Sequence, residues 1–167
     1  MMQWGLVPSW AEDPSSGNKM INARAETLAE KPSFKGLIGK RRCLVLADGF
    51  YEWRKEGKGK IPMRFTLRGG EPFSFAGLWD SWKKPAGGEL FSFTIITTQA
   101  NNLLRPIHER MPVILNKEGE EKWLDPDFKE IHELLVPYPV EMMEFYDVSK
   151  LVNSPRNDLP QCISPLP

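Results

Sequence analysis

Short apolar stretches bounded by glycine or proline recur along the chain of 167 residues, which contains fifteen prolines and thirteen glycines. This spacing disfavours long helices. Many of the stretches are rich in β-branched and aromatic residues, which suit a pleated surface. We therefore predict eight strands, near residues Gln3 to Val7, Arg42 to Ala47, Phe50 to Trp53, Met63 to Leu67, Phe73 to Leu78, Phe91 to Thr97, Val113 to Leu115 and Glu141 to Tyr146.

Helical patterns are fewer. They cover Glu26 to Glu30, a short turn at Lys35 to Ile38, Glu118 to Leu124 and Asp127 to Leu135. In the last two, apolar residues recur at helical spacing and predict one buried stripe. Its members are Trp123, Leu124, Phe128, Ile131, Leu134 and Leu135.

Eight short strands with a few peripheral helices predict an α+β fold, mainly antiparallel β. Closure into a barrel-like sheet would remove exposed strand edges, so a barrel-like arrangement is expected. The length fits a single domain over residues 1–167. The tail from Asn153 to Pro167 contains four prolines and is expected to be an irregular strap.

Composition narrows the protein class. Two cysteines, Cys43 and Cys162, and two histidines, His108 and His132, exclude a Cys/His-rich zinc site or a disulfide scaffold within one chain. We expect neither metal nor cofactor, and we assign His132 to structure. No apolar run has the length of a membrane span, and the first residues lack signal-peptide features, so we expect a cytoplasmic protein.

The net charge is zero, but it is divided unevenly along the sequence. Residues 35–68 contain ten basic and three acidic residues, a net charge of +7, and residues 117–147 contain three basic and ten acidic residues, a net charge of −7. The basic region is an attractive face for a polyanion. An ordinary solvated surface with clustered charges also fits this pattern.

Glu52 lies in an apolar strand, where alternation places it on one face with Phe50 and places Tyr51 and Trp53 on the other. A carboxylate enclosed by aromatic rings is partly desolvated, which raises its pKa and suits acid–base chemistry near neutral pH. An edge carboxylate that faces water fits the same pattern.

Two further segments place polar side chains near strand ends. Pro112 favours an extended Met111, so His108 and Arg110 are expected in a loop that enters a strand. In the other segment, Asn22, Arg24 and Glu26 alternate before a helix. Asn can orient a carbonyl and Arg can bind a phosphate through two parallel hydrogen bonds. A surface or capping histidine and a simple helix-entry loop are the structural alternatives for the two segments.

Taken together, seven sequence motifs resemble the SOS response-associated peptidase (SRAP) family, in order and in spacing. They are Trp4-Gly5-Leu6-Val7-Pro8-Ser9-Trp10, Asn22-Ala23-Arg24-Ala25-Glu26-Thr27, Arg41-Arg42-Cys43-Leu44, Asp48-Gly49-Phe50-Tyr51-Glu52-Trp53, Phe75-Ala76-Gly77-Leu78-Trp79, Thr94-Ile95-Ile96-Thr97-Thr98 and His108-Glu109-Arg110-Met111-Pro112.

The resemblance implies a mostly β domain that shields abasic sites in single-stranded DNA by linking to them covalently, and that associates with the nucleoid when DNA is damaged. In this family the initiator methionine is removed by self-processing. The exposed N-terminal cysteine then condenses with the sugar aldehyde, and its amine and thiol together form a thiazolidine.

By the same resemblance, Asn22 orients the reacting groups, Glu52 is the acid–base residue, His108 assists ring opening and Thr97 supports Glu52. The basic residues Arg24 and Arg110 are expected to bind phosphates. Trp4 and Trp53 are expected to stack on or wedge against exposed bases.

The chain departs from the family pattern at its start, Met1-Met2-Gln3-Trp4. Family members have a preceding segment that begins Met-Cys-Gly-Arg, so we expect this chain to be N-terminally incomplete and to lack the nucleophile. Cys43 is expected to be buried and inert, and neither cysteine adjoins a free amine. Two other functions fit the sequence: a non-covalent single-stranded DNA-binding module, and a carboxylate-dependent hydrolase that uses Glu52 with Glu26 or Asp48.

Overall fold

A computed structural model describes residues 1–167 and shows a mixed α+β fold made mostly of sheet, which confirms the predicted class. Neither α-helix has the length and hydropathy of a membrane span. The strands are β1 (Gln3–Trp4), β2 (Asn22–Arg24), β3 (Arg42–Ala47), β4 (Phe50–Glu56), β5 (Gly59–Leu67), β6 (Phe73–Lys83), β7 (Glu89–Gln99), β8 (Arg110–Pro112), β9 (Ile114–Leu115) and β10 (Met143–Asp147).

The helices are short. The α-helices are α1 (Pro32–Lys35) and α2 (Lys117–Leu124), and the 3₁₀ helices are η1 (Pro14–Lys19), η2 (Ala25–Thr27), η3 (Ile131–Leu134), η4 (Val140–Met142), η5 (Lys150–Asn153) and η6 (Pro160–Cys162).

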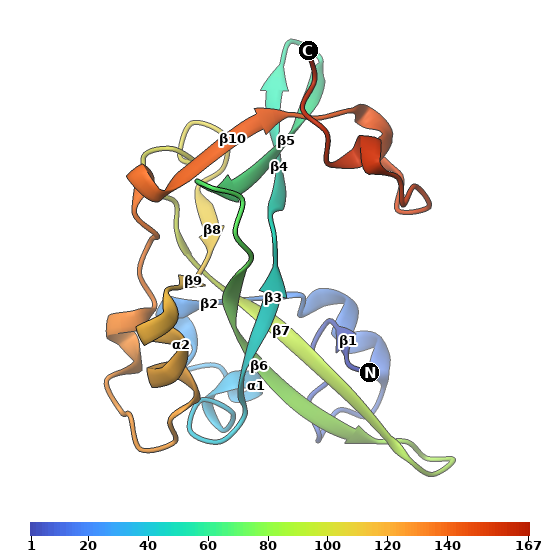
Figure 1. The fold of residues 1–167 in the computed structure, drawn as a ribbon. Coiled ribbons are helices and arrows are strands. Elements are labelled where there is room, and N and C mark those ends of the chain that lie inside the picture. Colours follow the sequence, from blue (N-terminus) through green and yellow to red (C-terminus); the bar gives the residue numbers. More distant parts are fainter. The chain divides into compact units, whose positions relative to one another are not determined.

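The larger sheet has seven strands and is built around β6 and β7, the two long antiparallel strands in Figure 1. Its main path is β1-β7-β6-β3, with β2 and β8 paired to β7 and β9 paired to β6. Both β1 and β2 pair with β7 in parallel, β1 with residues 92–93 and β2 with residues 95–97. Segments 3–4 and 22–24 therefore follow each other along β7.

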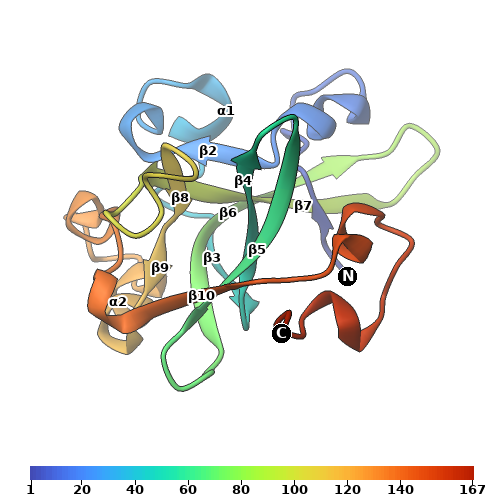
Figure 2. The same cartoon turned by 90° about the horizontal axis from the view of Figure 1, so that it is seen from above.

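The smaller sheet consists of β10, β5 and β4, all antiparallel. β4 and β5 form a hairpin (Figure 2). In its register Phe50 is opposite Phe65 and Glu56 is opposite Gly59. Gly57 lies in the turn with a φ of 55°, a conformation that a residue with a side chain rarely adopts.

The strands form two open sheets, so the expectation of a closed barrel was wrong. Several strands that pair with β6 and β7 are only two or three residues long, too short to continue the hydrogen bonding around a barrel. The chain divides into two compact units, residues 1–46, 74–98 and 112–137 in the first, and residues 47–73, 99–111 and 138–167 in the second. The single domain expected over residues 1–167 stays a prediction.

The core of the first unit gathers apolar side chains from β2, β6, β7, β9 and both α-helices. Trp123 of α2 is fully buried, and its indole Nε1 donates to the carbonyl of Cys43 at 3.0 Å. Figures 1 and 2 both show α2 beside β9. The Trp123 hydrogen bond and the contacts with β9 hold α2 against the large sheet.

The predicted helix over Asp127 to Leu135 is reduced to η3, and Leu124 of the predicted stripe is 51% exposed. The reason is local. Asp125, the residue before Pro126, is extended with a ψ of 114°, as steric contact with a following proline ring favours. The helical phase is lost there, although Ile131, Leu134 and Leu135 still pack against the core.

Candidate functional site

Glu52 lies in the middle of β4, opposite Met63 of β5. Its side chain is 23% exposed. Burial raises the pKa of this carboxyl above its ordinary value. The charges of His108 and Lys60 and a hydrogen bond from the Trp53 backbone lower it, but by less. The carboxylate is thus partly desolvated, which suits it to holding a proton nearer neutral pH than an exposed glutamate, while its enclosure by aromatic rings stays a prediction.

Glu52 and His108 belong to the same unit and lie close together. Glu52 Oε1 is 3.8 Å from His108 Nδ1, and the imidazole is 49% exposed. Sequence alone does not bring these two residues together, because 56 positions separate them along the chain. A carboxylate beside a partly exposed imidazole can pass a proton between a buried and an accessible position.

The same imidazole nitrogen also contacts the backbone of Arg110. Nδ1 lies 3.1 Å from the Arg110 N–H and 3.0 Å from the Arg110 carbonyl oxygen. A neutral ring with a lone pair on Nδ1 accepts from the N–H, whereas a protonated Nδ1 donates to the carbonyl. The loop before β8 therefore holds the ring in place in both protonation states.

In the first unit, Asn22 and Arg24 are exposed on β2 and the intervening Ala23 is buried. Asn22 is opposite Ile95 and Arg24 is opposite Thr97 on β7. The predicted extended alternation is confirmed for Asn22 and Arg24, whereas Glu26 lies in η2. The buried Thr97 hydroxyl donates to the carbonyl of Ala23 at 3.5 Å, so it supports β2.

Both candidate tryptophans have fixed indole rings. Trp4 is 53% exposed, and its Nε1 donates to the carbonyl of Ile21 at 2.9 Å, one residue before Asn22. Trp53 Nε1 donates to Asn153 Oδ1 at 2.7 Å. An indole held through its N–H keeps its ring face in a defined direction, which suits stacking on a base.

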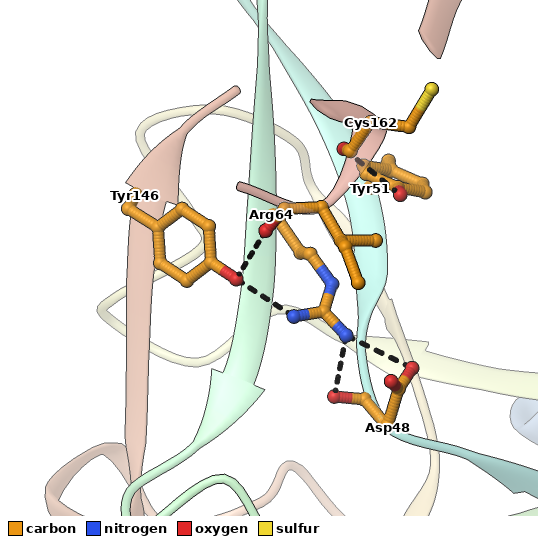
Figure 3. A network of polar contacts seen from close by, with 6 residues as sticks. Asp48, Tyr51, Arg64, Tyr146 and Cys162 are labelled. Carbon is orange, nitrogen blue, oxygen red and sulfur yellow. Dashed lines mark hydrogen bonds and ion pairs between the residues drawn. The ribbon is translucent and has the colours of Figure 1, made fainter. Parts of the chain in front are cut away.

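A buried arginine organises the second unit, and the motif analysis did not single it out. Arg64 of β5 donates to Tyr146 Oη at 2.7 Å and pairs with Asp48 Oδ1 at 2.9 Å (Figure 3). Tyr146 Oη in turn donates to the carbonyl of Ile163, and Tyr51 Oη donates to that of Cys162. An arginine flanked by Met63 and Phe65 in a strand was the available signal.

The carboxylate-dependent hydrolase considered from the sequence would use Glu52 together with Glu26 or Asp48. The Asp48 carboxylate pairs with Arg64, and Glu52 pairs with His108, so the two carboxylates have different partners. The predicted strap from Asn153 to Pro167 is irregular except for η6, and Tyr51 and Tyr146 attach it to the small sheet.

The two cysteines have the properties of structural thiols. Cys43 lies in β3, and burial raises its pKa to about 11. Cys162 is buried in η6, and both are free thiols. Cys43 is only partly buried rather than buried as expected, and its raised pKa favours the protonated, poorly nucleophilic thiol at neutral pH.

The predicted residues form one group in each unit. Trp4, Asn22, Arg24 and Thr97 lie along β1, β2 and β7 in the first unit. Glu52, Trp53, His108 and Arg110 lie on β4, on β8 and in the loop before β8 in the second. Each group contains an aromatic side chain, an arginine and a further polar side chain.

Residues 1–155 match the SOS response associated peptidase (SRAP) family. The chain belongs to this family. It is 51% identical over 168 residues to the abasic site processing protein YoqW of Bacillus subtilis, covering 97% of this chain and 74% of that protein. It is 42% identical over 192 residues to the abasic site processing protein HMCES of Gallus gallus, covering 99% of this chain and 56% of that protein.

Solved structures from two bacteria share the fold. A crystal structure of a protein from Bacteroides thetaiotaomicron has a TM-score of 0.91 and 39% identity, covering 99% of this chain and 75% of that one. A protein from Bordetella bronchiseptica has a TM-score of 0.81 and 31% identity, covering 89% and 76%. The expected N-terminal incompleteness of this SRAP chain stays a prediction.

Proposed function

We propose that this SRAP protein recognises abasic sites in single-stranded DNA and opens the abasic sugar to its aldehyde. The observation that carries the proposal is the pair of Glu52 and His108, a partly buried carboxyl beside an accessible imidazole. The names of the relatives, abasic site processing proteins, support the same substrate. The protein would act where its DNA substrate lies, at the nucleoid when DNA is damaged.

Ring opening of an abasic sugar needs two proton transfers. The C1 hydroxyl loses a proton as the bond from C1 to the ring oxygen breaks, and the ring oxygen gains one. Glu52, whose pKa burial raises, takes the first proton, and the protonated imidazole of His108 gives the second. Proton transfer between the pair then restores the starting state.

The remaining predicted site residues bind and orient the DNA strand in this proposal. Asn22 and Arg24 are exposed on one face of β2, where an amide can hold the aldehyde oxygen and a guanidinium can bind a phosphate. Arg110 is proposed as a second phosphate contact. Trp4 and Trp53 would stack on exposed bases, and Thr97 holds the strand that carries Asn22 and Arg24 through its hydrogen bond to the Ala23 carbonyl. The support of Glu52 by Thr97 that the family resemblance implies stays a prediction.

The covalent step that the family resemblance implies is a thiazolidine. An N-terminal amine and the C1 aldehyde form an imine and release water, and the cysteine thiolate then adds to the imine carbon as the nitrogen takes up a proton. The step requires an amine and a thiol on one residue. Cys43 and Cys162 have no adjacent free amine, so we propose that neither supplies the thiol.

The test is denaturing electrophoresis of the chain after incubation with single-stranded DNA carrying one abasic site, beside the intact strand. With borohydride present, we expect a stable adduct confined to the abasic strand. Borohydride reduces the imine between a protein amine and the C1 aldehyde to a stable C–N bond. Without borohydride, we expect no heat-stable band. A heat-stable band that disappears in Cys43→Ala would contradict the assignment of the thiol.

An adduct that forms equally well with Asn22→Ala, Glu52→Ala and His108→Ala variants would contradict the proposed site. Salt-dependent binding of intact strand that persists in these variants, without any abasic preference in the wild type, would instead support a non-covalent single-stranded DNA-binding module.

A further inference from the structure

A second feature of the small sheet is not explained by abasic-site chemistry. At the tip of the β4–β5 hairpin, Lys55 and Lys60 lie directly opposite each other in the strand register. Lys58 lies between them in the turn, and residues 55–60 are all exposed. Two ammonium groups on directly opposed residues repel, since the Cβ atoms of such pairs are about 5 Å apart.

The other long hairpin of the chain shows the usual arrangement. At the tip of the β6–β7 hairpin, Lys83 lies directly opposite Glu89. A cation opposite an anion stabilises paired strands, and a cation opposite a cation destabilises them. The β4–β5 tip therefore places like charges opposite each other, and an anionic partner would reduce their repulsion.

The face on which the two lysines lie indicates the kind of anion. Side chains alternate along a strand, so Lys55 shares a face with Trp53, and Lys60 shares it as the residue opposite Lys55. The Trp53 indole is fixed by Asn153 on the same face. An aromatic ring followed by a pair of cations is the arrangement by which proteins bind a single strand, with a base on the ring and phosphates at the cations.

We propose that Lys55 and Lys60 bind consecutive phosphates of the DNA strand that runs past Trp53, outside the abasic nucleotide itself. This inference rests on the proposed function and extends it to the flanking DNA. The contact is to backbone phosphates, so it is independent of base sequence and of whether the strand contains a lesion.

The test compares Lys55→Gln/Lys60→Gln with a matched control, Lys83→Gln/Lys84→Gln, which removes two positive charges from the other hairpin tip. Binding of a fluorescein-labelled single strand is followed by anisotropy from 50 to 300 mM NaCl, with intact and abasic oligonucleotides. Each phosphate contact on a single strand contributes about 0.7 to the slope of log K against log salt.

We expect the Lys55/Lys60 variant to bind more weakly at low salt and to flatten this slope by about 1.4, equally on intact and abasic strands. The control should keep the wild-type slope. Removing the opposed charges should leave the melting temperature unchanged or raise it, which separates lost contacts from lost folding. A slope equal to that of the wild type, or the same flattening in the control, would overturn the proposal.

Edge strands also carry lysines to prevent aggregation, and this alternative predicts a different result. If aggregation is the only reason for these lysines, the Lys55/Lys60 variant would aggregate at an unchanged slope, which would also overturn the proposal. A wild-type chain that binds both oligonucleotides equally would count against abasic-site recognition but not against the hairpin contact.

Discussion

Glu52 Oε1 lies 3.8 Å from His108 Nδ1, and the carboxylate is the less exposed member of the pair, at 23% against 49%. The negative charge of the pair is thus held where solvation is weaker. This arrangement favours protonation of the carboxyl and leaves the imidazole accessible to a substrate.

The raised pKa of Glu52 predicts a pH-dependent cost to folding. The folded state binds this proton more tightly than the unfolded state, so stability falls as the pH rises from the ordinary value through the raised pKa. Glu52→Gln should therefore melt at a higher temperature than the wild type at pH 8, and the difference should shrink towards pH 4. Thermal unfolding across this range measures it, with exposed Glu56→Gln as the control. A lower melting temperature for Glu52→Gln at pH 8 would contradict this.

Gly49 lies immediately before β4, against the Arg64 side chain and the Phe65 backbone. A Cβ at this position would lie 2.8 Å from Arg64 Nε and 2.9 Å from the Phe65 carbonyl oxygen, and the backbone oxygen cannot easily move. We expect Gly49→Ala to lower the free energy of unfolding by about 1–3 kcal/mol. Gly36→Ala is the control, since nothing lies within 4 Å of its Cβ. Equal urea midpoints for the two variants would contradict the predicted clash.

Tyr146 connects Arg64 to the C-terminal tail through one hydroxyl. Removal of that hydroxyl in Tyr146→Phe leaves both partners without it, which we expect to cost about 1–3 kcal/mol of unfolding free energy. Tyr51→Phe removes a single 3.2 Å bond to Cys162 and should cost less. Urea unfolding gives both values, and limited proteolysis should cut the tail faster in Tyr146→Phe. The reverse order of the two costs would argue against the arginine as the centre of the network.

Arg24 is proposed to neutralise one phosphate, so Arg24→Ala should weaken binding of single-stranded DNA and reduce the salt slope by about 0.7. The control, Lys117→Ala, removes an equal charge from the acidic segment and should leave the slope unchanged. Binding titrations at four salt concentrations suffice. Identical slopes for Arg24→Ala and the wild type would remove Arg24 from the site.

The sequence predicted strands well where local preference and burial agree. The strand over Arg42 to Ala47 has the predicted bounds, since its apolar run is bounded by basic residues and by Asp48-Gly49. The strand from Gln3 to Val7 ends at Trp4 instead, because Gly5 adopts a φ of 111°. The open sheets were not predictable from strand patterns, because pairing partners depend on tertiary contacts.

The candidate residues were found by their motifs, but their geometry was not. Strand alternation predicted the environment of Glu52, whereas its approach to His108 depends on how the loop before β8 returns to β4. Arg64 was counted only as surface charge, although it is 8% exposed. A single sequence does not distinguish a charged residue that faces water from one that meets its partners within the fold.

The most direct test of the central claim is a double-mutant cycle on the rate of borohydride-trapped adduct formation with abasic single-stranded DNA. The four proteins are the wild type, Glu52→Gln, His108→Gln and the double variant. If the pair acts as a unit, each single variant should slow trapping by roughly a hundredfold, and the double variant should be no slower than the slower single one. Wild-type rates in both single variants, or fully additive losses in the double variant, would contradict the assignment of Glu52 and His108 as the proton-transfer pair.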